Sequence, residues 1–251
     1  MYLLSASYGN DSIAMIQFAH EKNLDDVHVI YCDTGWAADG WLQRIEKGEK
    51  LSIKYGFTPH RVKAEIQFSD LMKAKKGFPS QKYQWCSGFL KGLPFLDISE
   101  RIDPEGVGLV MIGKRRDESE ARKNTPEFIE NSKYHGNRRV WHPLFLHDQD
   151  ARNLLINKTG IEVLDHRSDE CFPCVNSNRQ DIRRLTAERI NSIEFLEQET
   201  GQTMFRPAKH GGGKGIREVH KWACYGRGKY KPGQNDLLGD QGCGSPFGCG
   251  I

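Results

Sequence analysis

The amino-terminal stretch, residues 1–19, constrains the fold of this chain more than any other part of it. The apolar pair Leu3-Leu4 predicts a short strand that leads into a turn rich in Ser, Gly and Asp, and residues 13–19 then show helical periodicity. Such a strand, turn and helix present backbone N–H groups and a helix dipole to an anion. Ser7, Ser12 and Gly9 add hydroxyl donors and room for a close phosphate. The stretch predicts a phosphate-binding turn, although ordinary polar turns share this composition.

The turn matches neither the Walker loop, which ends in Gly-Lys-Ser/Thr, nor the GxGxxG dinucleotide loop. Residues 7–12, Ser-Tyr-Gly-Asn-Asp-Ser, instead resemble the PP-loop S-G-G-x-D-S of the adenine nucleotide α-hydrolase superfamily, which includes ATP pyrophosphatases and phosphoadenylyl-sulfate (PAPS) reductases. Tyr8 replaces the first glycine, a departure that the reductase branch shares. The resemblance implies an adenine nucleotide, ATP or PAPS, held with Mg²⁺ by this loop, whose contact residues would be Ser5, Ser7, Tyr8, Gly9, Asn10, Asp11 and Ser12.

The size and composition of the chain bound its class. Its 251 residues suffice for one sizeable α/β domain with an appendage. The net charge of +3 permits a nucleic-acid partner without requiring one. No apolar run is long enough for a membrane span, and Met1 almost abuts the first strand, so we expect a cytoplasmic protein with no membrane partner. Seven cysteines in such a protein favour metal or redox chemistry over structural disulfides.

Apolar strands alternate with helical segments along the first part of the chain. Strands are predicted at 27–32, 57–62 and 107–112, with a helix at about 40–55. This alternation predicts an α/β fold with a doubly wound parallel sheet, which is also the PP-loop architecture that the resemblance implies. Ligands bind such sheets at the carboxyl ends of the strands.

The character of the sequence changes beyond the sheet. Helices are predicted from about residue 148 and over 180–200, and the chain after Gly201 is rich in Gly, Lys and Arg. We therefore expect two parts. Residues 1–180 form a PP-loop nucleotide-binding, PAPS reductase-like domain, and residues 181–251 form a helical, then basic and irregular, Cys-containing extension. This extension either packs beside the core or orders only with a partner or metal.

Two charged turns follow predicted strands. Residues 113–122 resemble the G-x-R-R-x-x-S-x-x-R segment of the same family. Guanidinium groups suit phosphate and sulfate, so Arg115 and Arg116 are candidates to stabilise transition-state charge. Asp33 is a candidate ligand for Mg²⁺ or the nucleotide. A solvated loop and a simple strand-end turn are the structural alternatives. The further candidate nucleotide contacts in these turns are Gly113, Lys114, Arg122, Thr34 and Gly35.

The cysteines form a third pattern. Cys171 and Cys174 make a CxxC, and Cys86 lies upstream. The spacing resembles that of iron–sulfur adenylyl-sulfate reductases, in which a Cys-Cys pair precedes the CxxC, although Trp85 stands here in place of the first cysteine. The resemblance implies a [4Fe–4S] cluster, for which Cys243 from the tail is the fourth candidate ligand. Structural Zn²⁺ is the alternative, because spacing does not separate the two metals.

Three other cysteines have less defined roles. Cys32 follows a run of strand residues and is expected to be a buried apolar thiol, and Cys224 is a further candidate ligand. The reductases end in Glu-Cys-Gly, whose cysteine attacks sulfur, and this chain ends Gly248-Cys249-Gly250-Ile251 without the glutamate. Cys249 is therefore a candidate catalytic nucleophile, persulfide carrier or cluster ligand.

The basic segment 209–231 interleaves Lys and Arg with Gly and aromatic residues. This composition suits a nucleic-acid backbone, and a flexible solvated tail has the same composition. Three functions are compatible with the whole pattern. ATP-dependent sulfur transfer to DNA or tRNA, with a cysteine desulfurase as an implied sulfur donor, is favoured by Asp11-Ser12. Reduction of PAPS or adenylyl sulfate is favoured by Tyr8-Gly9 and the Cys-Gly tail. The third function is a non-catalytic, zinc-containing, nucleic-acid-binding subunit.

Overall fold

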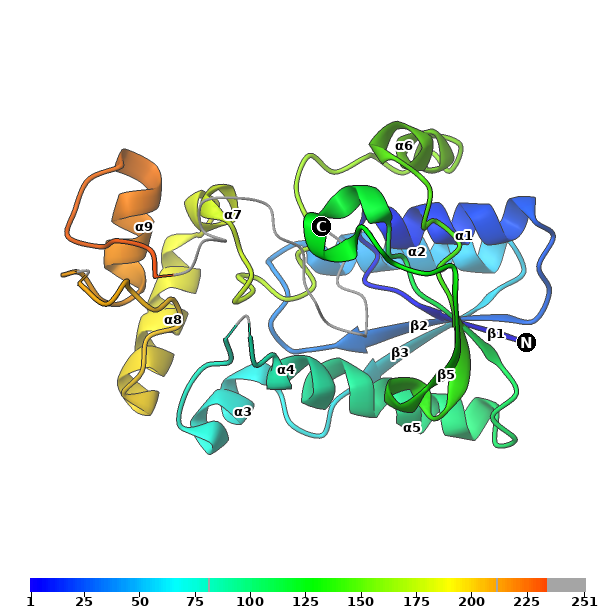
Figure 1. Cartoon of the computed structure of the whole chain (residues 1–251), viewed down its shortest axis with the longest axis horizontal. Helices are drawn as coiled ribbons and strands as arrows, with labels where there is room; N and C mark the ends of the chain where they lie inside the picture. Colours follow the sequence, from blue (N-terminus) through cyan, green and yellow to red (C-terminus); the bar gives the residue numbers. More distant parts are fainter. Residues whose placement is uncertain (81, 211, 234–251) are drawn as a thin grey trace.

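The computed structural model describes residues 1–80, 82–210 and 212–233, and these residues build an α/β fold around a six-stranded sheet (Figure 1). The strand order is β3-β2-β1-β4-β6-β5. β5 runs antiparallel to β6, and the other neighbouring strands pair in parallel. The strands are β1 (Tyr2–Ser5), β2 (Val27–Asp33), β3 (Thr58–Lys63), β4 (Leu109–Met111), β5 (Phe128–Ser132) and β6 (Arg138–Trp141).

Helices cover both faces of the sheet (Figure 1). One face carries α1 (Asn10–Glu21), α2 (Trp41–Lys54) and α6 (Gln149–Asn157). The other carries α5 (Leu93–Ile102), preceded by α3 (Phe68–Lys75), α4 (Trp85–Ser87) and the π-helical turn η1 (Gly88–Gly92). The predicted doubly wound sheet is therefore confirmed. The order reverses at β1, whose neighbours are β2 and β4, so the loop after β1 occupies the position at which such sheets bind ligands.

The core explains why the opening residues form a central strand. Leu3 and Leu4 are both fully buried but belong to different clusters, because successive strand side chains point to opposite faces. Leu4 packs with Ile13 and Ile16 of α1 on one face, and Leu3 packs with Phe95 of α5 on the other. A strand buried on both faces requires an unbroken apolar run, which is what the sequence supplies.

The carboxy-terminal helices form a separate layer beside the edge toward which the strands point (Figure 1). They are α7 (Arg179–Arg183), α8 (Ala187–Thr200) and α9 (Ile216–Tyr225). The single helix predicted over 180–200 is wrong in this detail, because the chain breaks between α7 and α8 and the Thr186 side chain caps α8.

The extension after Gly201 is not irregular throughout. Residues 216–225 form α9, since Ile216, Val219 and Ala223 make an apolar stripe at helical spacing. That stripe is buried in one cluster with Phe68 of α3 and Ile193 of α8. The division of the chain at residue 180 stays a prediction. Within the described residues, no helix combines the length and apolar character needed to cross a membrane.

Candidate nucleotide site and thiol pocket

The turn after β1 is folded on itself by its own hydroxyl groups. The backbone N–H of Ser7 donates to Oγ of Ser12 at 2.9 Å, the two hydroxyls lie 3.3 Å apart, and the N–H of Gly9 donates to Oγ of Ser7 at 3.2 Å. Gly9 is the N-cap of α1, and among the described residues no side chain caps this helix end. An uncapped helix start beside two hydroxyls is suited to bind an anion.

Asn10 fixes the turn to a distant segment. Its side-chain amide donates to the carbonyl of Leu164 at 2.9 Å, and its side-chain oxygen accepts from the N–H of Leu164 at 2.9 Å. The amide is therefore occupied by backbone partners, and what Asn10 offers a bound anion is its own main chain.

Tyr8 has a structural side chain and an unusual backbone. Its φ is +57°, the left-handed region that costs a non-glycine residue free energy. Its ring is fully buried against α2, where a Cβ added at Gly48 would lie 2.1 Å from the ring. Buried Arg44 of α2 donates from Nε to the carbonyl of Tyr8 at 3.0 Å and from Nη1 to that of Glu162 at 2.7 Å. Arg44 and the bare surface of Gly48 thus hold the loop in its strained conformation.

Asp11 lies at the centre of a buried charge cluster. Nε of Arg115 donates to its Oδ1 at 2.8 Å, and Nη1 of Arg152 on α6 lies 3.7 Å from the same oxygen. Burial and, next, the charge of Glu118 raise the pKa of Asp11 to about 7, against the lowering effect of the two arginines. Within the described residues, the buried Oδ2 of Asp11 has no hydrogen-bond partner.

The 113–122 segment is brought against the phosphate loop as the sequence predicted. Gly113 follows β4 closely enough that a Cβ there would lie 3.1 Å from Cβ of Asp11. Arg115 and Arg122 are buried, and Arg122 pairs with Glu118. Arg116 is directed elsewhere: its Nε donates to the carbonyl of Thr125 at 2.8 Å, and its guanidinium lies over the ring of Phe145.

Lys114 is half-buried, and its positive charge helps to lower the pKa values of the buried histidines His135 and His142, after the larger effect of burial. Lys114 therefore lies near these two rings.

A cleft opens beside Asp11, which we call the arginine cleft. It runs from Asn10 at the start of α1 to Gln180 of α7, so the carboxy-terminal layer forms one of its walls. Its arginines suit a polyanionic ligand, and its carboxylates suit a bound cation. The charged residues that line the cleft are Arg115, Arg152, Arg167, Arg184, Asp117, Glu118, Asp165 and Asp181.

The turn after β2 is hydrogen-bonded to the segment that carries the CxxC cysteines. Oδ1 of Asp33 accepts from the N–H of Gly35 at 2.9 Å, and Gly35 has a φ of +66°, which glycine adopts freely. The buried hydroxyl of Thr34 donates to the carbonyl of Glu170 at 2.9 Å. Thr34 therefore aligns residues 170–174 against the sheet edge. Oδ2 of Asp33 lies 3.7 Å from Nζ of Lys63.

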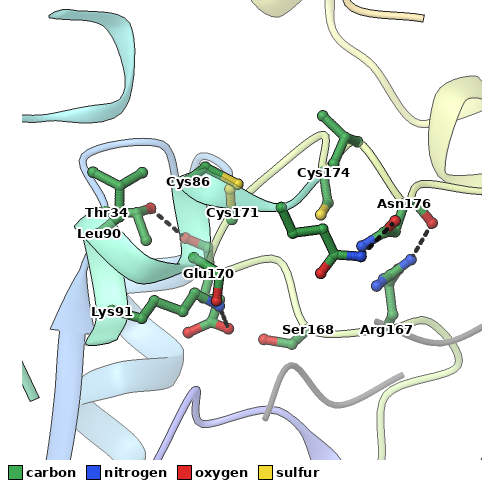
Figure 2. Close-up of a pocket in the computed structure, with 13 residues that line it drawn as sticks. Thr34, Cys86, Leu90, Lys91, Arg167, Ser168, Glu170, Cys171, Cys174 and Asn176 are labelled. Carbon is green, nitrogen blue, oxygen red and sulfur yellow. Dashed lines mark hydrogen bonds and ion pairs between the residues drawn. The ribbon is translucent and has the colours of Figure 1, made fainter. Parts of the chain in front are cut away.

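Three cysteines line one pocket, which we call the thiol pocket (Figure 2). Cys86 and Cys171 point toward one another, and Cys174 enters the same pocket from its other side (Figure 2). Lys91 and Glu170, both buried, form an ion pair on its floor. The predicted convergence of the distant Cys86 with the CxxC is therefore present in the structure.

The state of these thiols follows from their surroundings. The hydrogen bond with Cys174 and, next, burial raise the pKa of Cys171 well above its usual value. In the described residues, no group of three or more Cys, His, Asp or Glu side chains is arranged to hold a metal ion. The donor set fits a thiolate-bound metal in kind, but the described geometry does not complete a site. Cys243 and Cys249 lie outside the described residues.

Of the other cysteines that the structure describes, neither Cys32 nor Cys224 lines the thiol pocket. Burial raises the pKa of Cys32 to about 12, as expected of an inert apolar thiol. Cys224 lies on α9, where its Sγ is 3.4 Å from Nε2 of His220.

The thiol pocket adjoins a smaller pocket beside the phosphate loop. A smaller pocket at the carboxyl ends of β1 and β2 is lined by Ser5 and Ser7 of the loop and by Lys91 and Glu170 of the thiol pocket. The Lys91–Glu170 pair therefore separates the thiols from the anion-binding loop by one layer of side chains.

Several residues of the site are not marked in the sequence. Lys91 and Glu170 could have been noted as neighbours of the cysteine motifs, because they lie five residues after Cys86 and directly before Cys171. Arg152 and Arg44 have no local signal, since each is one more charged residue on an amphipathic helix. Their roles depend on which elements pack together.

The fold is a mostly parallel α/β sheet whose switch point carries a hydroxyl-rich turn suited to bind an anion. A family model described as the phosphoadenosine phosphosulfate reductase domain matches residues 1–187. The chain belongs to this family, because the match covers well over half of its length.

Two solved structures are similar to this chain. The first is a phosphoadenylyl-sulfate (PAPS) reductase from Candida auris in a phosphate complex, at 17% identity and a TM-score of 0.45, covering 64% of this chain and 73% of that one. The second is an NMN synthetase from Francisella tularensis, at 10% identity and a TM-score of 0.47, covering 79% and 84%. No curated protein sequence gave a significant match. The family match indicates a nucleotide-using enzyme of sulfur metabolism.

Proposed function

We propose that the chain cleaves ATP between its α and β phosphates and transfers sulfur to a nucleic acid through an adenylated intermediate. In the first step an acceptor oxygen attacks the α-phosphorus and pyrophosphate leaves. In the second step sulfur displaces AMP from the adenylated acceptor. The observation that carries this proposal is the buried Asp11 carboxylate, whose Oδ2 has no hydrogen-bond partner in the described part of the chain. A carboxylate oxygen with no protein partner beside the loop is the kind of ligand that a Mg²⁺–pyrophosphate leaving group requires.

The residues of the loop take distinct roles in this proposal. Main-chain N–H groups of residues 10–12 and the hydroxyls of Ser7 and Ser12 bind the leaving pyrophosphate. Arg115 neutralises charge that develops on the phosphates, and Arg152 supports it from α6. Ser5 and Thr34 lie at the carboxyl ends of β1 and β2, where the nucleoside would be placed. Bound Mg²⁺ would be held by Asp11 and would lower its pKa.

The remaining candidate contacts from the sequence contribute in other ways. The backbone of Tyr8 and Gly9, and the close approach of Gly113, shape the loop. Arg122 orients Glu118, which in turn accepts from the N–H of Arg115 at 3.1 Å. Arg116 would reach the phosphates only by leaving Phe145.

Sulfur chemistry is assigned to the cysteines. The proposed metal is a [4Fe–4S] cluster on Cys86, Cys171, Cys174 and Cys243, with Zn²⁺ as the alternative. What supports a metal of either kind is the convergence of three thiols on one pocket beside the nucleotide loop. Cys249 is the proposed persulfide carrier, and a cysteine desulfurase the proposed sulfur source. Nothing in the ATP-cleavage step depends on this metal.

Reduction of PAPS or adenylyl sulfate is the second candidate. It is favoured by the shared Lys91–Glu170 wall, which brings the thiols near a ligand bound at Ser7. In that reaction a thiolate, proposed to be Cys249, attacks the sulfur of the nucleotide and displaces the adenosine phosphate, leaving a cysteine S-sulfonate. A second thiol then releases sulfite. No carboxylate-bound cation is required.

One experiment separates these candidates. Anaerobically purified protein is incubated with Mg-ATP, with and without DNA or tRNA, and AMP and pyrophosphate are measured, while a parallel reaction with PAPS is assayed for sulfite. Release of AMP that depends on nucleic acid supports sulfur transfer. Sulfite without AMP supports the reductase. Asp11→Asn should remove AMP formation, whereas the exposed Asp25→Asn, which makes the same chemical change, should retain it. A colourless zinc protein with neither activity would contradict both reactions.

A further inference from the structure

The described part of the carboxy-terminal layer carries a strong excess of positive charge. Residues 201–233 contain eight Lys or Arg and one acidic residue, Glu218. Seven of the cations are exposed and have no ion pair with any described carboxylate, and we call six of them, all but Lys214, the basic surface. They are Arg206, Lys209, Lys221, Arg227, Lys229 and Lys231.

Backbone pairing gathers these cations although they come from three segments. Residues 206–209 run antiparallel to 229–233, with the N–H of Ala208 donating to the carbonyl of Lys231 at 2.9 Å and the N–H of Gly233 to that of Arg206 at 3.1 Å. Lys221 of α9 approaches Gly228, where an added Cβ would lie 3.8 Å from its Cδ. Glu218 approaches the same glycine. One acidic group therefore stands among six gathered cations.

Hydrogen bonds connect α9, which carries part of the basic surface, to α7, which lines the arginine cleft. Nε of Arg179 donates to the carbonyl of Ala223 at 3.0 Å, and Nε of Arg183 donates to the same carbonyl at 2.7 Å. The guanidinium of Arg179 also lies over the ring of Trp222. Both arginines belong to α7, whose Gln180 lines the cleft. Figure 1 shows α7 between α9 and the sheet, on the side toward which the strands point.

We propose that the basic surface docks the phosphate backbone of a nucleic-acid duplex and presents it to the arginine cleft. The inference rests on the proposed function, whose acceptor it names more closely. A duplex is favoured over a single strand because single-strand binding relies on several exposed aromatic rings. Among the described residues 201–233, Tyr225 is the one large aromatic side chain that is exposed. Duplex binding instead relies on neutralising phosphates.

The test measures binding without turnover. A short labelled DNA duplex is titrated with the full chain at several salt concentrations, in the absence of ATP. The variant replaces Lys209, Lys229 and Lys231 by Glu. We expect at least about a tenfold loss of affinity and a decrease of about 2 to 3 in the slope of log K against log salt, since each phosphate contact contributes about 0.9.

The matched control replaces Lys22, Lys50 and Lys54 by Glu. These lysines are also exposed, but Lys22 directly follows α1 and Lys50 and Lys54 lie on α2, toward the opposite ends of the strands. The control variant should bind as the unchanged protein does. Equal losses in both variants, no loss in the first, tighter binding to a single strand, or equal competition by polyglutamate would each overturn the proposal.

This assay also separates the two levels of inference. Unchanged duplex binding by the basic-surface variant, with AMP formation intact, refutes the docking surface and leaves the reaction standing. Intact binding by a protein that never forms AMP refutes the reaction and leaves the docking surface standing. Thermal melting of both variants verifies that they are folded.

Discussion

Replacement of Gly48 by Ala tests whether Tyr8 holds the phosphate loop through its contact with α2. Gly48 lies in the middle of α2, where glycine normally costs about 1 kcal/mol relative to alanine. An ordinary helix would therefore be stabilised by this change. Here the new Cβ would lie 2.1 Å from Cδ1 and 2.5 Å from Cε1 of Tyr8, far inside contact distance.

The cost of this clash exceeds the gain in helix propensity. The Tyr8 ring is fully buried, so it cannot swing into solvent. Overpacking of a close-packed site costs about 1 to 3 kcal/mol, and a contact this short belongs at the upper end of that range. We expect a net loss of about 2 kcal/mol, or about 4 to 8 °C in the melting temperature for a chain of this size. Because Tyr8 adjoins Gly9, affinity for pyrophosphate should decrease as well.

Chemical and thermal unfolding measure the stability, and titration calorimetry measures the affinity of the loop for pyrophosphate. Gly88→Ala is the matched control, because a Cβ there meets nothing within 4 Å. A double-mutant cycle with Tyr8→Gly isolates the contact: once the ring is removed, Gly48→Ala should stabilise the protein. If Gly48→Ala alone raises the melting temperature, the reasoning about the loop is refuted.

The remaining predictions concern the charges and thiols of the site. Asp11, the proposed Mg²⁺ ligand, would bind the cation as the carboxylate, and burial raises its pKa to about 7. Affinity for Mg²⁺ with pyrophosphate should therefore rise more steeply between about pH 6 and 8 in the unchanged protein than in Asp11→Asn, and identical pH profiles would exclude this role. Arg152→Met should weaken pyrophosphate binding by about tenfold, or about 1.4 kcal/mol, while retaining the fold; calorimetry and thermal melting check the two parts, and full affinity would contradict the assignment. Burial lowers the pKa of His142 from 6.5 to about 4, so the stability that depends on its neutral form is fully present above pH 6.5 and is lost as the pH falls toward 4. In His142→Gln, the loss of unfolding free energy between these pH values should be smaller by up to about 3 kcal/mol, as measured by unfolding at each pH. Cys86→Ser should reduce the iron or zinc bound by anaerobically purified protein, measured by elemental analysis, and an unchanged metal content would exclude Cys86 as a ligand.

The local chemistry of the site could be predicted from the sequence. The apolar strand, the serines and glycine of the turn, and the helix that follows lie within twenty residues, and each imposes its conformation through neighbours in the chain. The 113–122 segment was likewise predictable, because a buried strand places the turn that follows it at the ligand-binding edge of the sheet. For the same reason the alternation of strands and helices predicted the doubly wound fold.

Elements with weak local signals were not predicted. β5 and β6 are short, and β5 is largely exposed at the sheet edge, so no clear periodicity marks them. The break between α7 and α8 lies at the Thr186 cap, within a segment whose composition is helical throughout.

The chain order by itself determined which chemical groups are present: a phosphate-binding turn, an arginine segment and three spaced thiols. Only the tertiary structure decided how they combine. Packing of α6 on α1 places Arg152 beside Asp11, and the contact between Tyr8 and Gly48 sets the loop conformation. The physical reason is distance along the chain. Contacts between residues 40 to 140 positions apart depend on which faces of the elements pack together, and no local propensity encodes that choice.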